Sequence, residues 1–206
     1  MSKNFEKSKI VVLAIGLVCA LAFLINHLAT GATPSAGDSG NNLSNSQPVK
    51  EIEGYRNWTK VNAVPQLMPK RVATDCAYWS AGNGVEINGE GNPHRDKYFT
   101  VYVNEIGRRA MLGQKKPKFP EGSVIVKEKL TAKDSQTPEL LTVMIKQKQG
   151  FNPASGDWEY MVVDGTGTKV EGRGILQNCH SCHIGYQKND YIFRTYLSED
   201  VKSKLK

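Results

Sequence analysis

Residues 179–183 read Cys-His-Ser-Cys-His, the one Cys-x-x-Cys-His sequence in a chain of 206 residues. This pattern attaches haem c, because each thiol bonds to one vinyl group of the haem and the His that follows binds the iron. The sequence therefore predicts one covalent haem c, held by Cys179 and Cys182, with His183 as the axial ligand. The position of the motif near the C-terminus restricts the folds that can carry it.

A Cys-x-x-Cys pair can also form a redox disulfide or one half of a zinc site. A zinc site needs two further ligands, and the chain has no second Cys pair; His94, His180 and His183 do not have the spacing of a zinc finger. A thioredoxin-like motif lies in a strand–helix–strand unit, and that pattern is not found around residue 179. The His directly after the second Cys favours haem over both alternatives.

The N-terminus has the composition of an export segment. Three Lys within the first nine residues precede an apolar run over residues 10–25. Sixteen apolar residues are long for a signal peptide and short for a spanning helix. Residues 1–31 are therefore predicted to be a signal peptide or an N-terminal membrane anchor. Either one places the rest of the chain in the periplasm or another extracytoplasmic space, where haem c is attached.

Composition divides the remainder into two parts. Residues 32–53 are rich in Gly, Ser, Asn and Pro, which predicts a flexible linker. Residues 54–206 are long enough for one domain with its own core. The net charge is +7, but the basic residues are scattered and no basic helix has interleaved aromatic residues, which excludes nucleic-acid binding. The basic surface is either simply solvated or a docking surface for an acidic redox partner or anionic lipid.

The domain is rich in strand-forming segments. Aromatic and β-branched runs predict strands at residues 97–104, 123–130, 140–148 and 157–164. A short helix is predicted at 105–112, beginning after Asn104, and a second helix carries the haem motif. Because the strands are joined by short, hairpin-like connections, we expect an α+β fold with a mainly antiparallel sheet, a few short helices and a C-terminal haem motif.

This order of elements excludes two common haem-binding folds. Ordinary small cytochromes c have the motif near the N-terminus and a Met ligand after it, whereas Met161 is the last Met here and precedes the motif. The four-helix cytochromes c-prime do carry the motif near the C-terminus. The segments before it in this chain, however, have the composition of strands.

Several sequence blocks, taken in order, resemble the cytochrome P460 family over roughly residues 55–196. The blocks are Tyr55-x-x-Trp58, Pro93-His94, Val101-Tyr102-Val103-Asn104, Phe119-Pro120-Glu121-Gly122 with the strand that follows to Glu128, Met144-x-Lys146, Gly156-Asp157-Trp158, and the haem motif. The resemblance implies a mainly antiparallel sheet with a few helices, and a homodimer. The best-known members oxidise hydroxylamine, and related cytochromes c-prime-beta bind nitric oxide without this activity.

In the hydroxylamine-oxidising members a Lys nitrogen is bonded to a meso carbon of the haem. By its place in the motif, that residue would be Lys127 here. A haem pocket that removes water from the amine would favour the neutral form that such a bond requires. The alternative is an exposed Lys that alternates with core residues, as its neighbour Lys129 on the same strand face suggests.

Other candidate ligands are less specific. His94 could be a structural turn residue, a distal group or a second axial ligand, and we favour the structural role. The Met residues of the domain are expected in the core, and Arg108 and Arg109 either face solvent or lie near a bound anion. Cys76 is expected to be a buried thiol. No sixth iron ligand follows from the spacing.

These observations lead to one functional hypothesis and two alternatives. The chain is expected to be an extracytoplasmic protein with one haem c and an open iron site, which oxidises hydroxylamine or a related nitrogen compound and passes electrons to a soluble redox partner. The alternatives are nitric oxide binding without catalysis, and simple electron transfer, both on the same fold.

Overall fold

The computed structural model describes residues 47–80 and 94–206. Residues 43–206 form one unit of the chain, whereas residues 1–42 belong to another. The predicted signal peptide or anchor, and most of the predicted linker, therefore lie outside the described residues. Within the two described segments, no helix is long and apolar enough to span a membrane.

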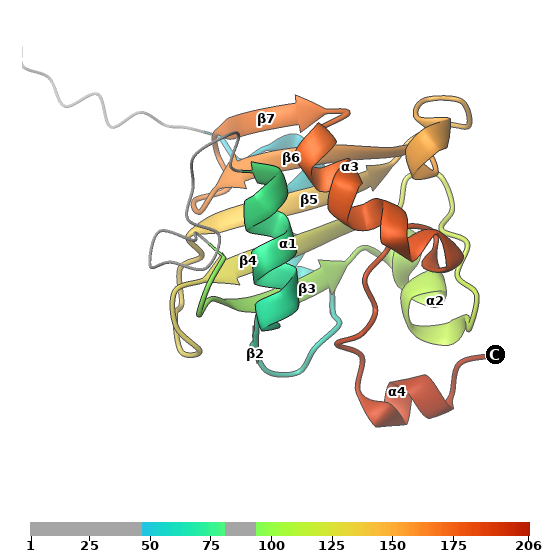
Figure 1. Cartoon of the computed structure of the whole chain (residues 1–206), viewed down its shortest axis with the longest axis horizontal. Helices are drawn as coiled ribbons and strands as arrows, with labels where there is room; N and C mark the ends of the chain where they lie inside the picture. Colours follow the sequence, from blue (N-terminus) through green and yellow to red (C-terminus); the bar gives the residue numbers. More distant parts are fainter. Residues whose placement is uncertain (1–46, 81–93) are drawn as a thin grey trace, which may run out of the picture. The chain divides into compact units, whose positions relative to one another are not determined.

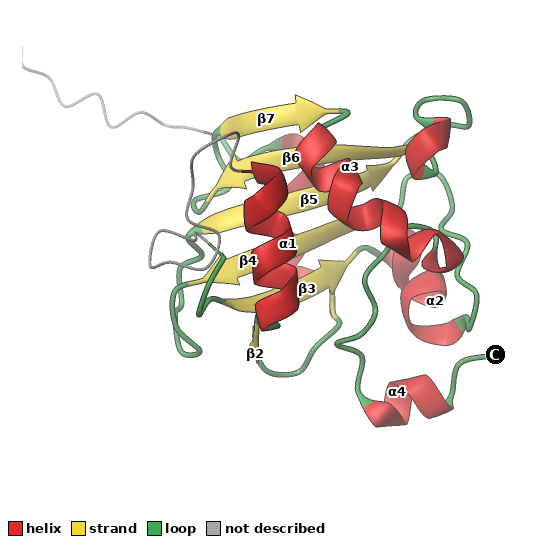
Figure 2. Cartoon of the chain, viewed as in Figure 1, coloured by secondary structure: helices red, strands yellow, loops and turns green. Residues whose placement is uncertain are grey.

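Seven antiparallel strands form one sheet, in the order β1-β3-β4-β5-β6-β7, with β2 pairing beside β1 on β3 (Figure 2). The strands are β1 (Thr59–Lys60), β2 (Gln66–Leu67), β3 (Tyr98–Val103), β4 (Val124–Leu130), β5 (Leu140–Lys146), β6 (Trp158–Asp164) and β7 (Val170–Gly174). Strands β3 to β7 follow one another both in the sequence and across the sheet. The predicted α+β fold with an antiparallel sheet is confirmed.

In the described part of the chain, four α-helices accompany the sheet: α1 (Lys70–Ser80), α2 (Glu105–Gly113), α3 (Gln177–His183) and α4 (Glu199–Ser203). Short 3-10 helices are formed by Lys50–Ile52, Tyr55–Asn57, Pro153–Ser155 and Ile184–Asn189. Helices α1 and α3 contact each other on one face of the sheet, and α2 lies near one end of the strands (Figure 1). The helical layer over this face is thus built from three separate parts of the sequence.

The predicted strands and the predicted helix at 105–112 are confirmed, with ends that differ by one or two residues. Helix α2 begins after Asn104, as predicted, because the Asn104 Oδ1 accepts a hydrogen bond from the Gly107 N–H at 3.1 Å. The same oxygen accepts from the Val124 N–H at 3.0 Å, which ties the start of the helix to β4. Helix α1 was not predicted.

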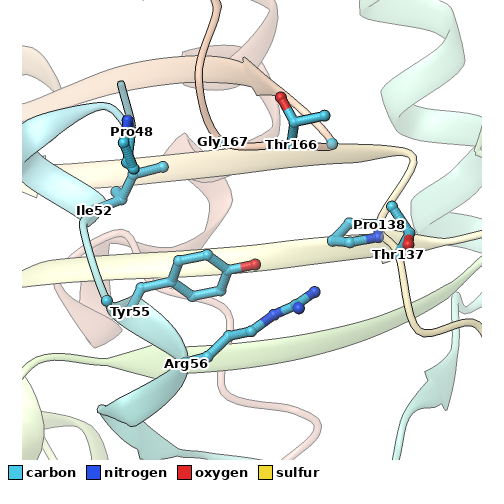
Figure 3. A pocket seen from close by; sticks show the side chains of 10 residues that line it. Pro48, Ile52, Tyr55, Arg56, Thr137, Pro138, Thr166 and Gly167 are labelled. Carbon is cyan, nitrogen blue, oxygen red and sulfur yellow. The ribbon is translucent and has the colours of Figure 1, made fainter. Parts of the chain in front are cut away.

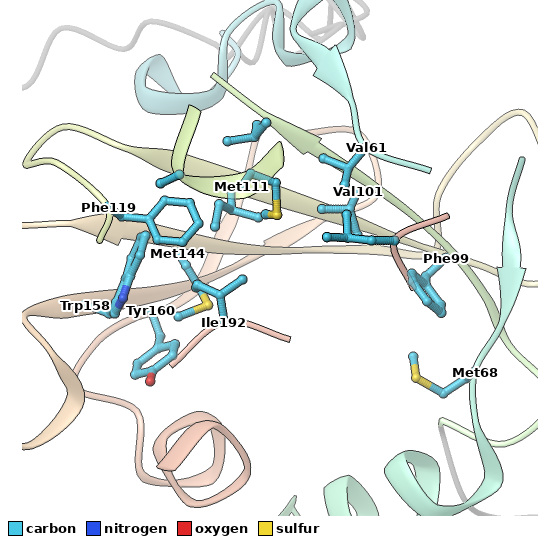
Figure 4. Close-up of a cluster of buried hydrophobic side chains, with 14 of the residues drawn as sticks. Val61, Met68, Phe99, Val101, Met111, Phe119, Met144, Trp158, Tyr160 and Ile192 are labelled. Carbon is cyan, nitrogen blue, oxygen red and sulfur yellow. The ribbon is translucent and has the colours of Figure 1, made fainter. Parts of the chain in front are cut away.

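Buried apolar side chains form two clusters, one on each face of the sheet. The helix-side cluster (Figure 4) consists of Val61, Met68, Ala73, Phe99, Val101, Val103, Ala110, Met111, Phe119, Ile125, Met144, Trp158, Tyr160, Ile192 and Leu197. The back cluster consists of Ile52, Val124, Val126, Leu141, Val143, Ile145, Met161 and Val163. Both faces of the sheet are therefore covered, and adjacent residues of one strand belong to different clusters.

Strand β4 shows this alternation most clearly. Ile125 lies in the helix-side cluster and Val126 in the back cluster, so Lys127 and Lys129 face the helix side. The alternative of an exposed Lys127 drew support from Lys129 on the same strand face, but Lys129 is only 5% exposed, and its Nζ lies 3.0 Å from the Glu139 carboxylate. Burial and this ion pair reflect the helices that cover the face, which the alternation alone could not reveal.

The folded part of the chain begins before residue 54. Ile52, within the predicted linker 32–53, is 2% exposed and belongs to the back cluster. The Val49 N–H donates to the Gly167 carbonyl at 2.8 Å. The last residues of the predicted linker are thus part of the layer that covers the back face.

Candidate haem site

The haem motif lies on α3, as predicted. Cys179, Cys182 and His183 occupy positions i, i+3 and i+4 of this helix, which places them on one side of it. Cys179 packs against the helix-side cluster. The motif therefore faces the covered side of the sheet, where two thioether bonds to a haem would be surrounded by apolar side chains.

A backbone carbonyl fixes the orientation of the His183 ring. The His183 Nδ1 lies 2.6 Å from the Tyr191 carbonyl oxygen. Because a carbonyl can only accept, Nδ1 carries the proton and Nε2 keeps the lone pair that binds iron. Burial lowers the pKa of His183 to about 4, the Tyr191 hydrogen bond opposes this shift, and the positive charge of Lys127 adds to it. The imidazole is therefore neutral near pH 7, as an iron ligand must be.

Aromatic side chains restrain the same ring from two directions. Phe193 contacts His183 edge to face, with 4.8 Å between ring centroids, and Tyr186 packs on Phe193 at 3.8 Å. Tyr160 of β6 lies 5.5 Å from His183 at a tilted angle. Together with the carbonyl contact, these rings hold the imidazole in one orientation.

Tyr160 also lies beside both thiols of the motif. Burial raises the pKa of Tyr160 to about 12, and the charges of Cys179, Tyr191 and Cys182 act in the same direction, against a hydrogen bond with Ser155. Only nearby groups have such an effect. The motif thus lies over β6, where Tyr160 contacts the His183 ring.

Lys127, the predicted cross-link residue, lies on the same face of the sheet as this site. It is half-buried in the middle of β4 and pairs with Val101 on β3 and Thr142 on β5. Its positive charge contributes to the lowered pKa of His183 on one side and of His94 on the other. The structure therefore brings Lys127 and the haem motif together, although they are far apart in the sequence.

His94 lies close to two Lys of β4. Burial lowers its pKa to about 4, and the charges of Lys129 and Lys127 add to the shift, while that of Glu139 opposes it. His94 is therefore neutral near pH 7. This state suits a buried structural residue and a metal ligand equally.

The residues around the motif fit a haem. Arg194 is 6% exposed, and its Nε donates to the Met111 carbonyl at 3.1 Å, but its buried Nη2 has no hydrogen-bond partner among the described residues. The same is true of the buried Nδ1 of His180. An unsatisfied buried guanidinium is unfavourable, and guanidinium groups bind carboxylates well, so Arg194 suits the carboxylates that a haem carries. The helix-side cluster supplies apolar surface for its ring.

The other sequence candidates do not join the site. Met68, Met111, Met144 and Met161 are all buried in the two clusters, and Met161 lies on the back face. Arg108 and Arg109 are exposed, and Arg108 pairs with Glu105 at 2.9 Å, so the solvated alternative is the correct one. Cys76 lies in α1, but its side chain is outside the described part.

The zinc alternative is also without support. Among residues 47–80 and 94–206, no three or more His, Cys, Asp or Glu side chains come together in a way that could hold a metal ion. His94 and the motif therefore do not form the Cys2His2 set considered from the sequence.

A separate pocket of about 360 Å³ lies on the back face, away from the motif (Figure 3). Its lining residues are Pro48, Ile52, Gly54, Tyr55, Arg56, Thr137, Pro138, Gly165, Thr166 and Gly167. At its edge the Tyr55 hydroxyl and the Arg56 Nε both donate to the Glu128 Oε1, at 2.7 and 2.8 Å. These polar groups satisfy one another, which indicates a structural role.

Sequence reasoning missed several residues that build the site. They are Tyr160, which docks the motif; Tyr191, whose carbonyl orients His183; Phe193, which packs on the ring; and Arg194. One signal was available, because the segment after the motif contains Tyr186, Tyr191, Phe193 and Tyr196 within eleven residues. Such a density of aromatic residues directly after a haem motif is typical of a wall around the ligand.

Comparison with known proteins agrees with the architecture. The family model for cytochrome P460 matches residues 52–194, which extend from the start of the back cluster through the sheet and α3 to Arg194. A comparison with curated proteins gave no match. The matched region contains every strand of the sheet and the complete haem motif. The chain belongs to the cytochrome P460 family and, as that family implies, is a haem-binding cytochrome.

Proposed function

We propose that this protein carries a single haem c and oxidises hydroxylamine or a related small nitrogen compound at an open iron site. The observation that supports the proposal is that Lys127 of β4 and His183 of α3 lie on the same face of the sheet, with the charge of Lys127 contributing to the lowered pKa of His183. A bound haem would take electrons from the substrate at its iron and pass them to a soluble acceptor. The family match supports the haem itself and leaves the substrate as our inference.

Residues of the chain attach the haem, bind its iron and modify its ring. Cys179 and Cys182 hold the haem through thioether bonds, and His183 binds the iron through Nε2 while Tyr191 accepts from Nδ1. Lys127 is within reach of electrostatic interaction with His183 and is half-buried on the covered face. We infer that its neutral amine adds to a meso carbon of the haem: the new N–C bond would replace one π bond of the ring, and the amine would lose a proton to water. The addition would interrupt conjugation at that carbon and change the iron's electronic properties.

The absorption spectrum of the dithionite-reduced, haem-loaded protein tests the cross-link directly. We expect a Soret band displaced far to the red of an ordinary haem c. In Lys127→Ala the band should return to the ordinary position, whereas Lys133→Ala, which removes an exposed Lys from a loop, should leave it displaced. An ordinary Soret band in the unmodified protein would reject the cross-link.

The reaction is tested separately by mixing the haem-loaded protein with hydroxylamine and an electron acceptor. We expect acceptor reduction that depends on hydroxylamine and is lost in Lys127→Ala but kept in Lys133→Ala. No hydroxylamine-dependent reduction in the unmodified protein would reject the enzymatic proposal.

Nitric oxide binding without catalysis is the second candidate. It is favoured by the apolar character of the helix-side cluster and by the burial of Met68, Met111 and Met144 as core residues. An ordinary Soret band together with a ferrous protein that binds nitric oxide would support this candidate. A low-spin spectrum that carbon monoxide does not change would instead support simple electron transfer.

For location and assembly, the proposal rests on the N-terminal sequence and on the resemblance to the family. We infer that residues 1–31 export the chain to the periplasm or another extracytoplasmic space, and that the protein is a homodimer. Cell fractionation of the full chain distinguishes a cleaved signal peptide from a membrane anchor. Light scattering of the purified protein measures the molar mass, and a monomeric mass would reject the dimer.

A further inference from the structure

Two consecutive residues after the haem motif have an unusual backbone conformation. Asp190 and Tyr191 have positive φ angles of 53° and 64°. This left-handed conformation is unfavourable for residues other than Gly, and two in a row persist only where surrounding contacts enforce them. The turn they form supplies the carbonyl that lies 2.6 Å from the His183 Nδ1.

The carboxylate of Asp190 is the centre of those contacts. Both of its oxygens lie 2.8 Å from the Lys146 Nζ at the end of β5. One of them also accepts from the Phe119 N–H at 2.8 Å. Asp190 is 5% exposed and the Lys146 side chain 14%, so the ion pair is largely shielded from water. A buried pair with this number of hydrogen bonds restricts the position of its backbone.

Two further contacts hold the same turn. The Trp158 Nε1–H donates to the Asp190 carbonyl at 2.8 Å, and the Trp158 ring lies 5.1 Å from the Lys146 Nζ. Gly156 lies against the Tyr191 ring so closely that a Cβ there would be 2.6 Å from it. The turn is therefore fixed from β5, from β6 and from the loop before β4, by residues remote from it in the sequence.

From this chain of contacts we propose that the Lys146–Asp190 pair is a positioning element for the axial ligand. It holds the turn so that the Tyr191 carbonyl accepts the His183 Nδ1–H, and through that bond it tunes the iron. A hydrogen bond to Nδ1–H makes the imidazole a stronger donor, which favours ferric over ferrous iron and lowers the reduction potential. The inference rests on the ligation of iron by His183 in the proposed function and does not depend on Lys127.

The test uses haem-loaded protein and measures its reduction potential and its iron–imidazole stretching frequency. A general loss of stability would not be expected to raise the first and lower the second together. The double variant Lys146→Met/Asp190→Asn removes the ion pair without changing the net charge. We expect its reduction potential to rise, and the iron–imidazole stretch of the ferrous protein to move to lower frequency in resonance Raman spectra. The single variant Lys146→Arg can keep the ion pair. Its reduction potential and iron–imidazole stretching frequency should therefore stay close to those of the unmodified protein.

Controls separate charge from position. Lys148→Met removes an exposed Lys two residues away and should leave the iron–imidazole stretch unchanged. In Lys146→Met alone, loss of a positive charge would by itself lower the potential, so a lower stretching frequency in this variant reports the hydrogen bond rather than the charge. If the double variant does not fold, the stretching frequency of Lys146→Met alone is measured in its place, because this variant also removes the ion pair.

The inference is overturned if the double variant keeps the potential and the stretching frequency of the Lys148→Met control, or if Lys146→Met, measured in its place, keeps that stretching frequency. A five-coordinate ferrous parent protein without an iron–imidazole stretch would overturn both the inference and His183 ligation. An ordinary Soret band with a shifted stretch in the double variant would reject the Lys127 cross-link and support the inference.

Discussion

Lys127 lies near enough to His183 for its positive charge to help lower the pKa of the imidazole, after the larger effect of burial. The two residues reach this arrangement from different directions: Lys127 projects from the middle of β4, and His183 ends α3. The antiparallel pairing of β4, β5 and β6 sets the lateral distance between Lys127 and Tyr160, on which the motif docks. The sheet register thus decides which side chain faces the haem site.

Acid should destabilise the protein through His94. Its pKa is about 4 in the folded protein, below the ordinary value of 6.5, because of burial and the charges of Lys129 and Lys127. Between about pH 6.5 and pH 4 the unfolded chain therefore binds a proton that the folded protein does not, so stability falls as the pH falls. Allowing for partial exposure, the loss at this residue is on the order of 2 kcal/mol.

The measurement is the free energy of unfolding in urea between pH 7 and pH 4, for the protein and for His94→Gln. The variant should lose less stability over this interval. Below pH 4.5, Glu139 adds a loss of its own, since hydrogen bonds from Lys97 and Lys129 outweigh burial and lower its pKa. Equal pH dependence of the two proteins would contradict a depressed pKa at His94.

Replacing Asn104 should lower the free energy of unfolding more than is usual for a residue close to the surface. Its Oδ1 accepts from the Gly107 and Val124 N–H groups, and its Nδ2 donates to the Gly122 carbonyl at 2.8 Å. Asn104→Ala removes all three hydrogen bonds and should lower the free energy of unfolding by about 2 kcal/mol.

Ser198→Ala is the matched control, because Ser198 caps the short helix α4 through one exposed hydrogen bond to Val201 at 3.3 Å. We expect a loss of about 0.5 kcal/mol or less in urea unfolding. Similar losses in the two variants would mean that Asn104 acts only as a helix cap and does not link α2 to β4.

Gly165 should tolerate no side chain. A Cβ at this position would lie 2.0 Å from the Pro138 carbonyl oxygen, a backbone atom that cannot move aside as a flexible side chain can. Gly165→Ala should therefore lower the free energy of unfolding by about 3 kcal/mol. Gly113→Ala at the end of α2 meets only the Arg109 side chain at 3.8 Å and should be neutral or stabilising by about 0.5 kcal/mol. Thermal unfolding of both variants compares them, and equal transition temperatures would refute the close contact.

On the back face, the Tyr55 hydroxyl donates to the carboxylate of Glu128, which is 5% exposed. Tyr55→Phe removes a hydrogen bond to a buried charged acceptor and should cost about 2 kcal/mol. The control is Tyr98→Phe, since Tyr98 makes no such bond and should lose less than about 0.5 kcal/mol. Urea unfolding at pH 7 is the measurement. A change at Tyr55 no larger than that at Tyr98 would show that Arg56 alone satisfies Glu128.

Local patterns predicted the strands and α2, because alternation of apolar residues and the Asn104 cap act within a few residues of the chain. The motif likewise identified Cys179, Cys182 and His183 without any knowledge of the fold. The ion pair of Lys146 with Asp190 could not be predicted in this way. Its members are separated by 44 residues, and only the finished packing brings them together.

The same limit applies to the burial of Lys129. A strand with polar residues on alternate positions predicts one face in water, yet here the helices and the segment after the motif cover that face. The sequence of residues 70–80 did not predict α1, so no helix was expected to cover that face. Lys129 is buried because this face is covered by helices and by the segment after the motif, which come from both ends of the domain.

Adjacent residues of β4 face opposite sides of the sheet, and this arrangement has a consequence for natural variation. A change at position 127 alters the surroundings of the haem motif, whereas the neighbouring positions 126 and 128 belong to the opposite face. Substitutions on the face toward the haem motif can therefore change its chemistry while the packing of the back cluster, which stabilises the fold, stays the same. A scaffold divided in this way can acquire or lose an activity through single substitutions and still produce a stable protein in every intermediate generation.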